Sequence, residues 1–359
     1  MKKSEEMLFA LLRASLQEKR TETSFFVDVT ETDWNECFLL AKKQGVMALA
    51  WDGVLALPNH LRPPLTLKLQ WGVKVDRYEK QYIRYCRTID KLSRLYARNG
   101  IATMQLKGVG FSSLYPIPCH REGGDIDIYT YAADKERMSD AEANELANCL
   151  MEQQGIEVDT HSPKHSVFYY KGVPIENHKT FLNVETYQVA VKVERTLKEN
   201  MKPQITTLDV GEVLTPSPLF NTLFIAFHAM QHYGSGLALH HLCDWAMILR
   251  RYGLQVPEEI KKEPFYEGIA AMTKLCNRYL GTSVHVEGGD DIVDTMLHEI
   301  LYPCSLVHIP TRNKIGIVIY KIKRLLYVHK LKSRVLPSSL FNRIWKSVVF
   351  HICNPRTIF

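Results

Sequence analysis

Two aspartates separated by a single residue, Asp125 and Asp127, are the clearest chemical signal in this sequence. They begin the alternating segment DIDIYTY (125–131), a pattern that is typical of a β-strand. Side chains two residues apart in a strand point to the same side, so both carboxylates share one face while Ile126 and Ile128 share the other. Two carboxylates this close repel each other unless a cation compensates them, and Mg²⁺ prefers oxygen ligands of this kind. The pair therefore predicts a site for Mg²⁺ or Mn²⁺, with a solvated pair of aspartates at a strand end near a turn as the alternative.

A third carboxylate would complete such a site, and Glu176 is the residue that we expect to supply it. It lies in the second half of HSVFYYKGVPIENH (165–178), which predicts a β-hairpin with its turn at the Lys-Gly pair. Glu185 and Asp159 are the alternative third ligands. His178 lies two residues after Glu176 and should share its face, so it is the histidine that we expect to contact a nucleotide in the same cleft.

A glycine-containing loop precedes the aspartate pair. The short apolar run IATMQL (101–106) predicts a strand that leads into Lys107 and Gly108 at the start of an expected helix, an arrangement suited to binding phosphate groups. A solvated lysine at a helix start is the alternative for Lys107. Gly124 removes side-chain bulk where a nucleotide or a metal-bound phosphate would approach. Strand, loop, helix and two acidic strands follow in the order that two-metal phosphoryl transfer requires.

The elements that must position these residues divide the chain into four regions. Residues 1–99 predict an N-terminal helical region that ends with a long helix over 65–97. Residues 100–216 combine short strands with an amphipathic helix and predict a mixed sheet. Residues 217–310 are again helical, and 311–359 form a basic amphipathic tail. We therefore expect an α+β fold in which a mixed sheet with flanking helices lies between two helical regions.

The composition is that of an ordinary globular protein. Of 359 residues, 46% are hydrophobic and 23% charged, which is enough apolar material to bury a sizeable core. The eight cysteines form no CxxC pair, which argues against a zinc ribbon or a disulfide framework. The sequence predicts neither a membrane-spanning helix nor a signal peptide. We therefore expect a cytoplasmic location.

The charge is distributed unevenly along the chain. The formal net charge is +6, but eleven Lys and Arg residues follow the last acidic residue, Glu299, so the preceding part is net negative. A basic tail without acids predicts an anionic partner such as RNA, polyphosphate or the inner membrane surface. Residues 315–336 alternate apolar and basic residues at helical spacing, which predicts an amphipathic helix able to lie on a membrane. A solvated helix packed on the protein is the alternative.

Four histidines and one aspartate in the C-terminal half have no assigned role. His228 and His232 are four residues apart and therefore lie on one face of an expected helix. His240, His241 and Asp244 form a second cluster, in which Asp244 could orient His240. The first spacing is compatible with zinc, although the adjoining glutamate of a metalloprotease motif is absent. Packing within the helices and contact with a nucleotide or acceptor are the other interpretations.

The segment LKGVGFSSLYPIPCHREGGDIDIYTYAAD (106–134) resembles the core motif of a bacterial family of uncharacterised nucleotidyltransferases in the DNA polymerase beta-like superfamily. That motif is Leu-Lys-Gly, then an aromatic residue, then Arg, then two Asp separated by a hydrophobic residue. IENH (175–178) is similar to the family's acid-x-His strand, and FHAMQHY with HHLCDWAMIL is similar to its helical His and Asp motif. The resemblance covers roughly residues 30 to 255.

This resemblance implies a palm-like nucleotidyltransferase sheet over residues 100–216. It implies transfer of a nucleoside monophosphate from a nucleoside triphosphate to a hydroxyl acceptor, with release of pyrophosphate. Asp125 and Asp127 would hold two Mg²⁺ ions that bridge the triphosphate, and Glu176 would ligate the catalytic metal and help to deprotonate the acceptor. The family's association with surface polysaccharide biosynthesis implies a sugar-related acceptor by analogy alone.

The resemblance also implies the phosphate contacts. Lys107 and Gly108 would meet the β- and γ-phosphates and Arg121 would be a further contact, with an ion pair to Glu122 or another nearby acid as the alternative. The superfamily's usual Gly-Gly or Gly-Ser pair is replaced here by Lys-Gly. A nucleotide-binding or interaction protein without catalytic activity is therefore one alternative function. A glycosyltransferase whose Asp-x-Asp motif holds a metal is the other.

Overall fold

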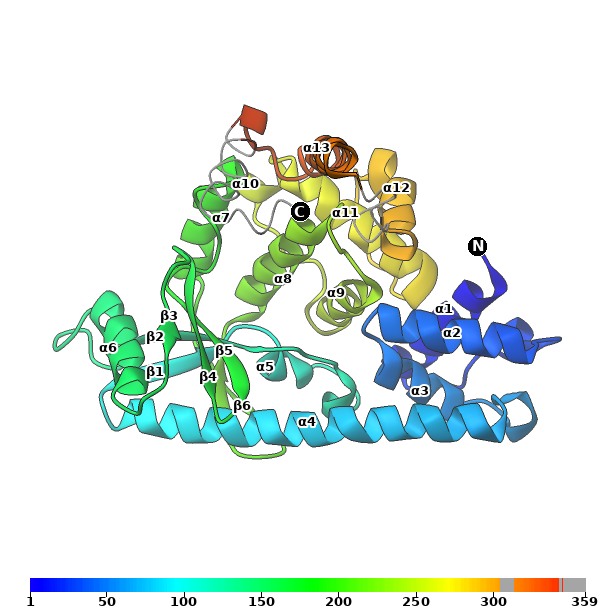
Figure 1. Ribbon diagram of the computed structural model, residues 1–359, viewed down its shortest axis with the longest axis horizontal. Helices are drawn as coiled ribbons and strands as arrows, with labels where there is room; N and C mark the ends of the chain where they lie inside the picture. Colours follow the sequence, from blue (N-terminus) through cyan, green and yellow to red (C-terminus); the bar gives the residue numbers. More distant parts are fainter. Residues whose placement is uncertain (304–312, 342–343, 345–359) are drawn as a thin grey trace.

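One long helix, α4 (Leu65–Ala97), runs along the whole molecule and carries the N-terminal helices at one end and the sheet at the other (Figure 1). The computed structural model of the chain describes residues 1–303, 313–341 and 344, without the side chains of 314–315. The predicted long helix over 65–97 is confirmed. Its apolar residues recur at helical spacing, so one continuous side of α4 is available for packing along its full length.

Helices form the N-terminal layer, as predicted. Thr30 caps α2 by accepting the backbone N–H of Asp33, whose carboxylate in turn accepts the N–H of Thr30. Helix α1 is buried on nearly all sides between α2, α3 and the C-terminal helices. The elements are α1 (Lys3–Gln17), the 3₁₀ turn η1 (Thr23–Phe26), α2 (Glu31–Lys43), α3 (Met47–Leu55) and the 3₁₀ turn η2 (Asn59–Leu61).

The middle of the chain forms a seven-stranded mixed sheet in the order β3-β4-β5-β2-β1-β7-β6. The β2–β5 and β1–β7 neighbours are parallel, and the other neighbours are antiparallel. The predicted hairpin is β4–β5, so the expected α+β fold with a mixed sheet is confirmed. The strands are β1 (Ile101–Gln105), β2 (Ile126–Ala132), β3 (Val158–Asp159), β4 (His165–Tyr170), β5 (Val173–His178), β6 (Gln204–Thr207) and β7 (Glu212–Thr215).

Helices α4 and α6 (Asp140–Glu152) cover one face of the sheet. Ile126 and Ile128 of β2 lie on this face, in a buried cluster shared with both helices. Because side chains alternate along a strand, Asp127 of β2 and Glu176 of β5 project from the other face. The apolar face of β2 and β5 thus packs on the helices, and the polar face of these strands remains available for chemistry.

Helices from the second half of the chain cover the face that carries the carboxylates. Phe181, just after β5, joins the two layers, because its ring lies 4.6 Å from that of Tyr129 on β2 and 4.7 Å from that of Phe220 on α8. These elements are α7 (Gln188–Glu199), α8 (Pro218–His232), α9 (Leu239–Tyr252), α10 (Glu258–Lys261), α11 (Phe265–Leu275), the π turn η4 (Cys276–Leu280) and α12 (Asp290–Leu301).

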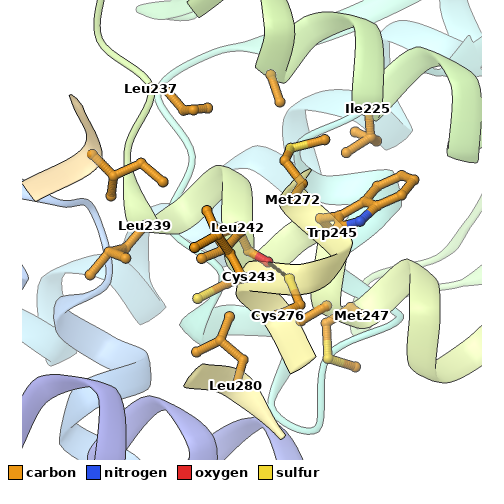
Figure 2. Packing of buried hydrophobic residues seen from close by; sticks show 14 of the residues in the cluster. Ile225, Leu237, Leu239, Leu242, Cys243, Trp245, Met247, Met272, Cys276 and Leu280 are labelled. Carbon is orange, nitrogen blue, oxygen red and sulfur yellow. Dashed lines mark hydrogen bonds between the residues drawn. The ribbon is translucent and has the colours of Figure 1, made fainter. Parts of the chain in front are cut away.

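Helices α8, α9 and α11 enclose an apolar core (Figure 2). Trp245 is fully buried there, and its indole N–H donates to the Thr273 hydroxyl at 3.0 Å. The Cys276 thiol donates to the Leu242 carbonyl at 3.4 Å. These two bonds satisfy polar atoms that would otherwise be buried without partners.

A buried amide joins the N-terminal layer to the C-terminal helices. Gln44, which follows α2, donates from Nε2 to the Ile300 carbonyl at 2.7 Å. Its Oε1 accepts the backbone N–H of Leu239 at 2.8 Å. The two helical regions that we expected over residues 1–99 and 217–310 also contribute to one shared hydrophobic cluster. They therefore pack directly on each other.

The predicted amphipathic helix of the tail is α13 (Lys314–Lys332). Val328 and Leu331 are buried against the protein, whereas Ile319 and Ile322 are about half exposed beside lysines and arginines. Part of the basic tail lies outside the described residues. Among the described residues, no helix combines the length and apolar character that crossing a membrane requires. The expected contact of the tail with RNA or a membrane surface stays a prediction.

The close approach of α1 and α3 depends on Gly53. A Cβ added at this position would lie 2.4 Å from the Leu11 carbonyl oxygen, so the backbone of α1 would have to move. We expect Gly53→Ala to lower the free energy of unfolding by about 1–3 kcal/mol because of this overpacking. Denaturant titration followed by circular dichroism measures the change.

Gly72→Ala is the matched control, because the same change is made in the middle of another helix. A Cβ at Gly72 would meet only the ring of Trp51, at an ordinary 3.7 Å. We expect this variant to be more stable than the parent by up to about 1 kcal/mol, since alanine favours the helix. Equal effects of the two substitutions would contradict the close α1–α3 packing.

Candidate active site

The parallel pairing of β2 and β5 brings three carboxylates together. Asp127 stands opposite Glu176 in the register of these strands, and Asp125 immediately precedes β2. One oxygen from each of the three side chains lies within 4.8 Å of the other two. Small side-chain rotations would bring all three into the first coordination sphere of one or two divalent cations.

The alternative third ligands lie elsewhere. Asp159 is on β3 at the edge of the sheet, where it is exposed and accepts the backbone N–H of His161. Glu185 lies in the connection between β5 and α7. Within the described part of the chain, neither joins the acidic cluster. Glu176 is therefore the residue with the geometry of a third ligand.

The charge of Asp127 is compensated inside the protein. Asp127 is fully buried, and Lys107 Nζ lies 3.2 Å from its Oδ2. Burial acts to raise the pKa of Asp127, but Lys107 and His178 outweigh burial and hold this pKa well below its ordinary value. Burial also acts to lower the pKa of Lys107, but Asp127 and Asp125 raise it above its ordinary value. Both partners are therefore charged at neutral pH.

His178 contacts two carboxylates of the acidic cluster. It is fully buried, and its Nε2 donates to Asp127 Oδ1 at 3.0 Å. The same nitrogen lies 3.7 Å from Glu176 Oε2, and His178 holds the pKa of Glu176 below its ordinary value. His165, opposite His178 in the β4–β5 register, places Nδ1 3.3 Å from Glu176 Oε2. His178 thus contacts two carboxylates of the site, and the nucleotide contact that we expected of it stays a prediction.

Sequence reasoning missed a second cation, Lys164, which directly precedes β4. Burial lowers the pKa of Lys164, while Asp127 and Glu176 oppose this shift and the positive charge of Lys107 adds to it. The ammonium group therefore belongs to the electrostatic environment of the carboxylates. The one signal in the sequence is its place beside His165, at the start of the hairpin that carries Glu176.

Glycines shape the backbone next to the carboxylates. Gly108 has a φ of 65°, which favours glycine, and a Cβ there would lie 3.4 Å from the Asp125 carbonyl oxygen. The helix predicted to follow is α5 (Val109–Ser112), which has only four residues. Gly124 is exposed, and a Cβ on it would meet no atom within 4 Å. This side of the site is therefore open.

A ligand would have to reach the site over its partly exposed members, Asp125 and Glu176. The cavity that borders Asp125 and Gly108 measures about 20 Å³, which is room for about one water molecule. Burial and the charge of Asp127 raise the pKa of Asp125. Both causes disfavour the charged form of Asp125, and a bound cation would stabilise that form.

Arg121 joins the loop before β2 to the C-terminal helices. Its Nε and Nη2 donate to the two carboxylate oxygens of Asp244 at 2.9 and 2.7 Å, and the Tyr115 hydroxyl donates to Asp244 at 2.6 Å. Both charged side chains are nearly buried. Glu122, the partner that we considered by name, instead accepts the backbone N–H of Ala48 at 2.9 Å. Arg121, for which we expected a phosphate contact with an ion pair as the alternative, thus forms an ion pair with Asp244.

The comparisons with known proteins bear on the same region. A sequence profile described as "Uncharacterised nucleotidyltransferase" matches residues 30–262. The match spans the whole sheet, the three carboxylates and the Arg121–Asp244 pair. No curated protein and no solved structure matches the chain.

The Arg121–Asp244 pair predicts a large effect on stability. In Asp244→Ala, the guanidinium of Arg121 would remain buried without a counter-charge. We expect the free energy of unfolding to fall by about 3–5 kcal/mol in this variant. Asp76→Ala is the control, since it breaks the exposed ion pair with Lys80 and should cost less than about 1 kcal/mol. Similar small losses in both variants, measured by denaturant titration, would show that Arg121 is not held as described.

Glu122 predicts a dependence of stability on pH. Burial raises the pKa of Glu122 to about 6, from an ordinary 4.5, although the N–H of Ala48 opposes the shift. Between these two pH values the folded protein binds more protons than the unfolded chain, so stability falls as the pH rises. Relative to Glu122→Gln, the wild-type protein should lose about 1–2 kcal/mol between pH 4 and 7. Unfolding titrations of both proteins across this range measure the difference, and a pH-independent difference would contradict the raised pKa.

Proposed function

The chain belongs to a family of uncharacterised nucleotidyltransferases, and from this premise we propose that it is a metal-dependent enzyme that moves a nucleoside monophosphate from a nucleoside triphosphate to a hydroxyl acceptor. The observation that carries the proposal is the convergence of Asp125, Asp127 and Glu176 within 4.8 Å of one another. Nucleotidyl transfer needs such a cluster, because carboxylates hold the divalent cations that neutralise the negative charge of the triphosphate and of the attacking oxygen.

The residues fit a divalent cation. All three offer carboxylate oxygens, which suit Mg²⁺ or Mn²⁺. Oδ2 of Asp127 is buried and accepts no hydrogen bond among the described residues, and its contact is the ion pair with Lys107. When bound, the metal would lower the pKa of the attacking hydroxyl and stabilise the charge that develops on the phosphates.

Residues of the chain would bind the phosphates and accept the proton of the acceptor hydroxyl. Lys107 and Lys164 supply positive charge for the phosphates next to the carboxylates. The acceptor oxygen forms a bond to the α-phosphorus, the bond from this phosphorus to the bridging oxygen breaks, and pyrophosphate leaves. The hydroxyl proton passes to the partly exposed carboxylate of Glu176. Gly108 and Gly124 keep the backbone open to the phosphates.

Two residues take positioning roles in this proposal. His178 orients Asp127 through their 3.0 Å hydrogen bond and stabilises its charged form. Arg121 anchors the loop that carries Gly124 and Asp125 through its ion pair with Asp244. Neither needs to contact the nucleotide. The acceptor that we propose, by analogy with the family's association, is sugar-related.

Asp127→Asn tests the proposal, since it keeps the shape of the side chain and removes its charge. We expect Mg²⁺-dependent binding of a nonhydrolysable nucleoside triphosphate, measured by calorimetry, to weaken at least about tenfold. Release of pyrophosphate from nucleoside triphosphates, measured over a panel of sugar, sugar-phosphate, RNA and protein hydroxyl acceptors, should fall at least about 100-fold. Removal of divalent ions with a chelator should abolish both in the wild-type protein.

Asp159→Asn is the matched control, because it makes the same change on the exposed edge strand β3 and should leave both measurements unaltered. Triphosphate binding that is equally strong in the Asp127 variant would refute the assigned site. Tight binding without pyrophosphate release on any acceptor would favour the non-catalytic alternative. Release of a nucleoside diphosphate from a sugar nucleotide would favour a glycosyltransferase.

A further inference from the structure

Three histidines from two helices meet beside the acidic cluster. His228 and His232 lie one turn apart on α8, and His241 lies on the first turn of α9. One ring nitrogen from each lies within 4.8 Å of the other two. The ring centroids of His228 and His232 are 4.7 Å apart, and that of His241 lies 5.5 and 4.8 Å from them. The three imidazoles therefore enclose one small volume.

We propose that His228, His232 and His241 bind a transition-metal ion of the Zn²⁺ class, at a site separate from the carboxylates. Zn²⁺ accepts imidazole nitrogens at about 2.0–2.1 Å, so ligand nitrogens around a tetrahedral ion stand about 3.4 Å apart. Bringing the three observed ring nitrogens to these distances needs side-chain movements of only about 1 Å. Three protein ligands leave a fourth position for water or for an oxygen of a substrate.

Few hydrogen bonds engage the three rings. Among the described residues, neither His228 nor His232 forms a side-chain hydrogen bond. The nearby acid, Asp244, gives its oxygens to Arg121 and Tyr115 and leaves none committed to a histidine. His228 and His232 therefore present ring nitrogens that are not committed to a hydrogen bond among the described residues, whereas His241 has one such bond, to the backbone N–H of Ala238.

The histidines are in the form that binds metals. Burial lowers the pKa of His232 to about 4, and burial also holds the pKa values of His228 and His241 well below their ordinary value. Lys107 lowers all three pKa values further. These shifts favour the neutral form of each ring, which offers a lone pair to a metal. Neutral imidazole is the ligand that Zn²⁺, Co²⁺ and Ni²⁺ prefer, whereas Mg²⁺ avoids it.

On α9, both His240 and His241 have ring nitrogens that are hydrogen-bonded to the backbone. His240 Nδ1 donates to the Gln44 carbonyl at 3.2 Å, and its ring lies 3.9 Å from that of His241. His241 Nδ1 accepts the backbone N–H of Ala238 at 3.2 Å. This hydrogen bond fixes the orientation of the His241 ring at the start of α9.

The histidine cluster is a neighbour of the acidic cluster. Phe224, one turn before His228 on the same helix, lies 6.5 Å from His178 between ring centroids. Lys107, which pairs with Asp127, also lowers the pKa of His228. The two clusters nevertheless differ in chemistry, since one offers only oxygens and the other only nitrogens. They can therefore be loaded with different ions and tested separately.

Cobalt titration tests the proposal. The chelator-treated full-length protein is titrated with Co²⁺ in the presence of millimolar Mg²⁺, and visible absorption reports tetrahedral coordination. We expect one Co²⁺ per chain, displaced by one equivalent of Zn²⁺. His232→Gln and His228→Gln should each weaken Co²⁺ binding at least about tenfold. Circular dichroism establishes that the variants are folded, and the two positions give independent tests.

Two controls locate the ion. His298→Gln changes an exposed histidine on α12 and should bind Co²⁺ like the wild-type protein. Glu176→Gln disables the carboxylate cluster and the neighbouring His165–Glu176–His178 group, and it should also retain the Co²⁺ spectrum. No Co²⁺ bound at one equivalent by the wild-type protein, or equal binding by His232→Gln and His298→Gln, would overturn the proposal. The titration contains no nucleotide, so its outcome is independent of nucleotidyl transfer.

Discussion

The buried negative charge of Asp127 is the constraint on which the rest of the site depends. A carboxylate removed from water is costly unless charge and hydrogen bonds compensate for it. Lys107 supplies the charge from the end of β1, and His178 supplies the hydrogen bond from the end of β5. These strands are the two neighbours of β2 in the sheet. The strand order β5-β2-β1 is therefore what makes a charged residue tolerable at this position.

The loop that leads into β2 is held from both helical regions. Gln81 and Tyr85 of α4 donate to the carbonyls of Gly123 and Gly124 at 2.8 and 3.0 Å. On the other side, Arg121 forms its two-pronged bond with Asp244 of α9, and α9 in turn packs on the N-terminal layer. The flanking helices thus act on the site by fixing the backbone that presents its carboxylates, which is how a scaffold preorganises a binding site.

Most secondary-structure elements were predictable, because their signals are local. Helical spacing over 65–97 and the Lys-Gly turn between β4 and β5 each depend on a few neighbouring residues. The arrangement of these elements was not predictable in the same way. Residues 1–99 and 217–310 share one hydrophobic cluster, and Gln44 links them through bonds to Leu239 and Ile300. The apolar patterns show that faces must be buried but do not say against which partner.

The same distinction between local patterns and tertiary contacts applies to the candidate active site. The sequence alone predicted that the carboxylates of Asp125 and Asp127 lie close together, because side chains two residues apart in an extended segment point to the same side. Only the tertiary structure decided that Glu176 stands beside Asp127, that Lys164 joins them, and that Arg121 pairs with Asp244. These contacts join residues that are far apart in the chain. Their choice depends on strand order and on the packing of whole helices, and local sequence patterns do not encode either one.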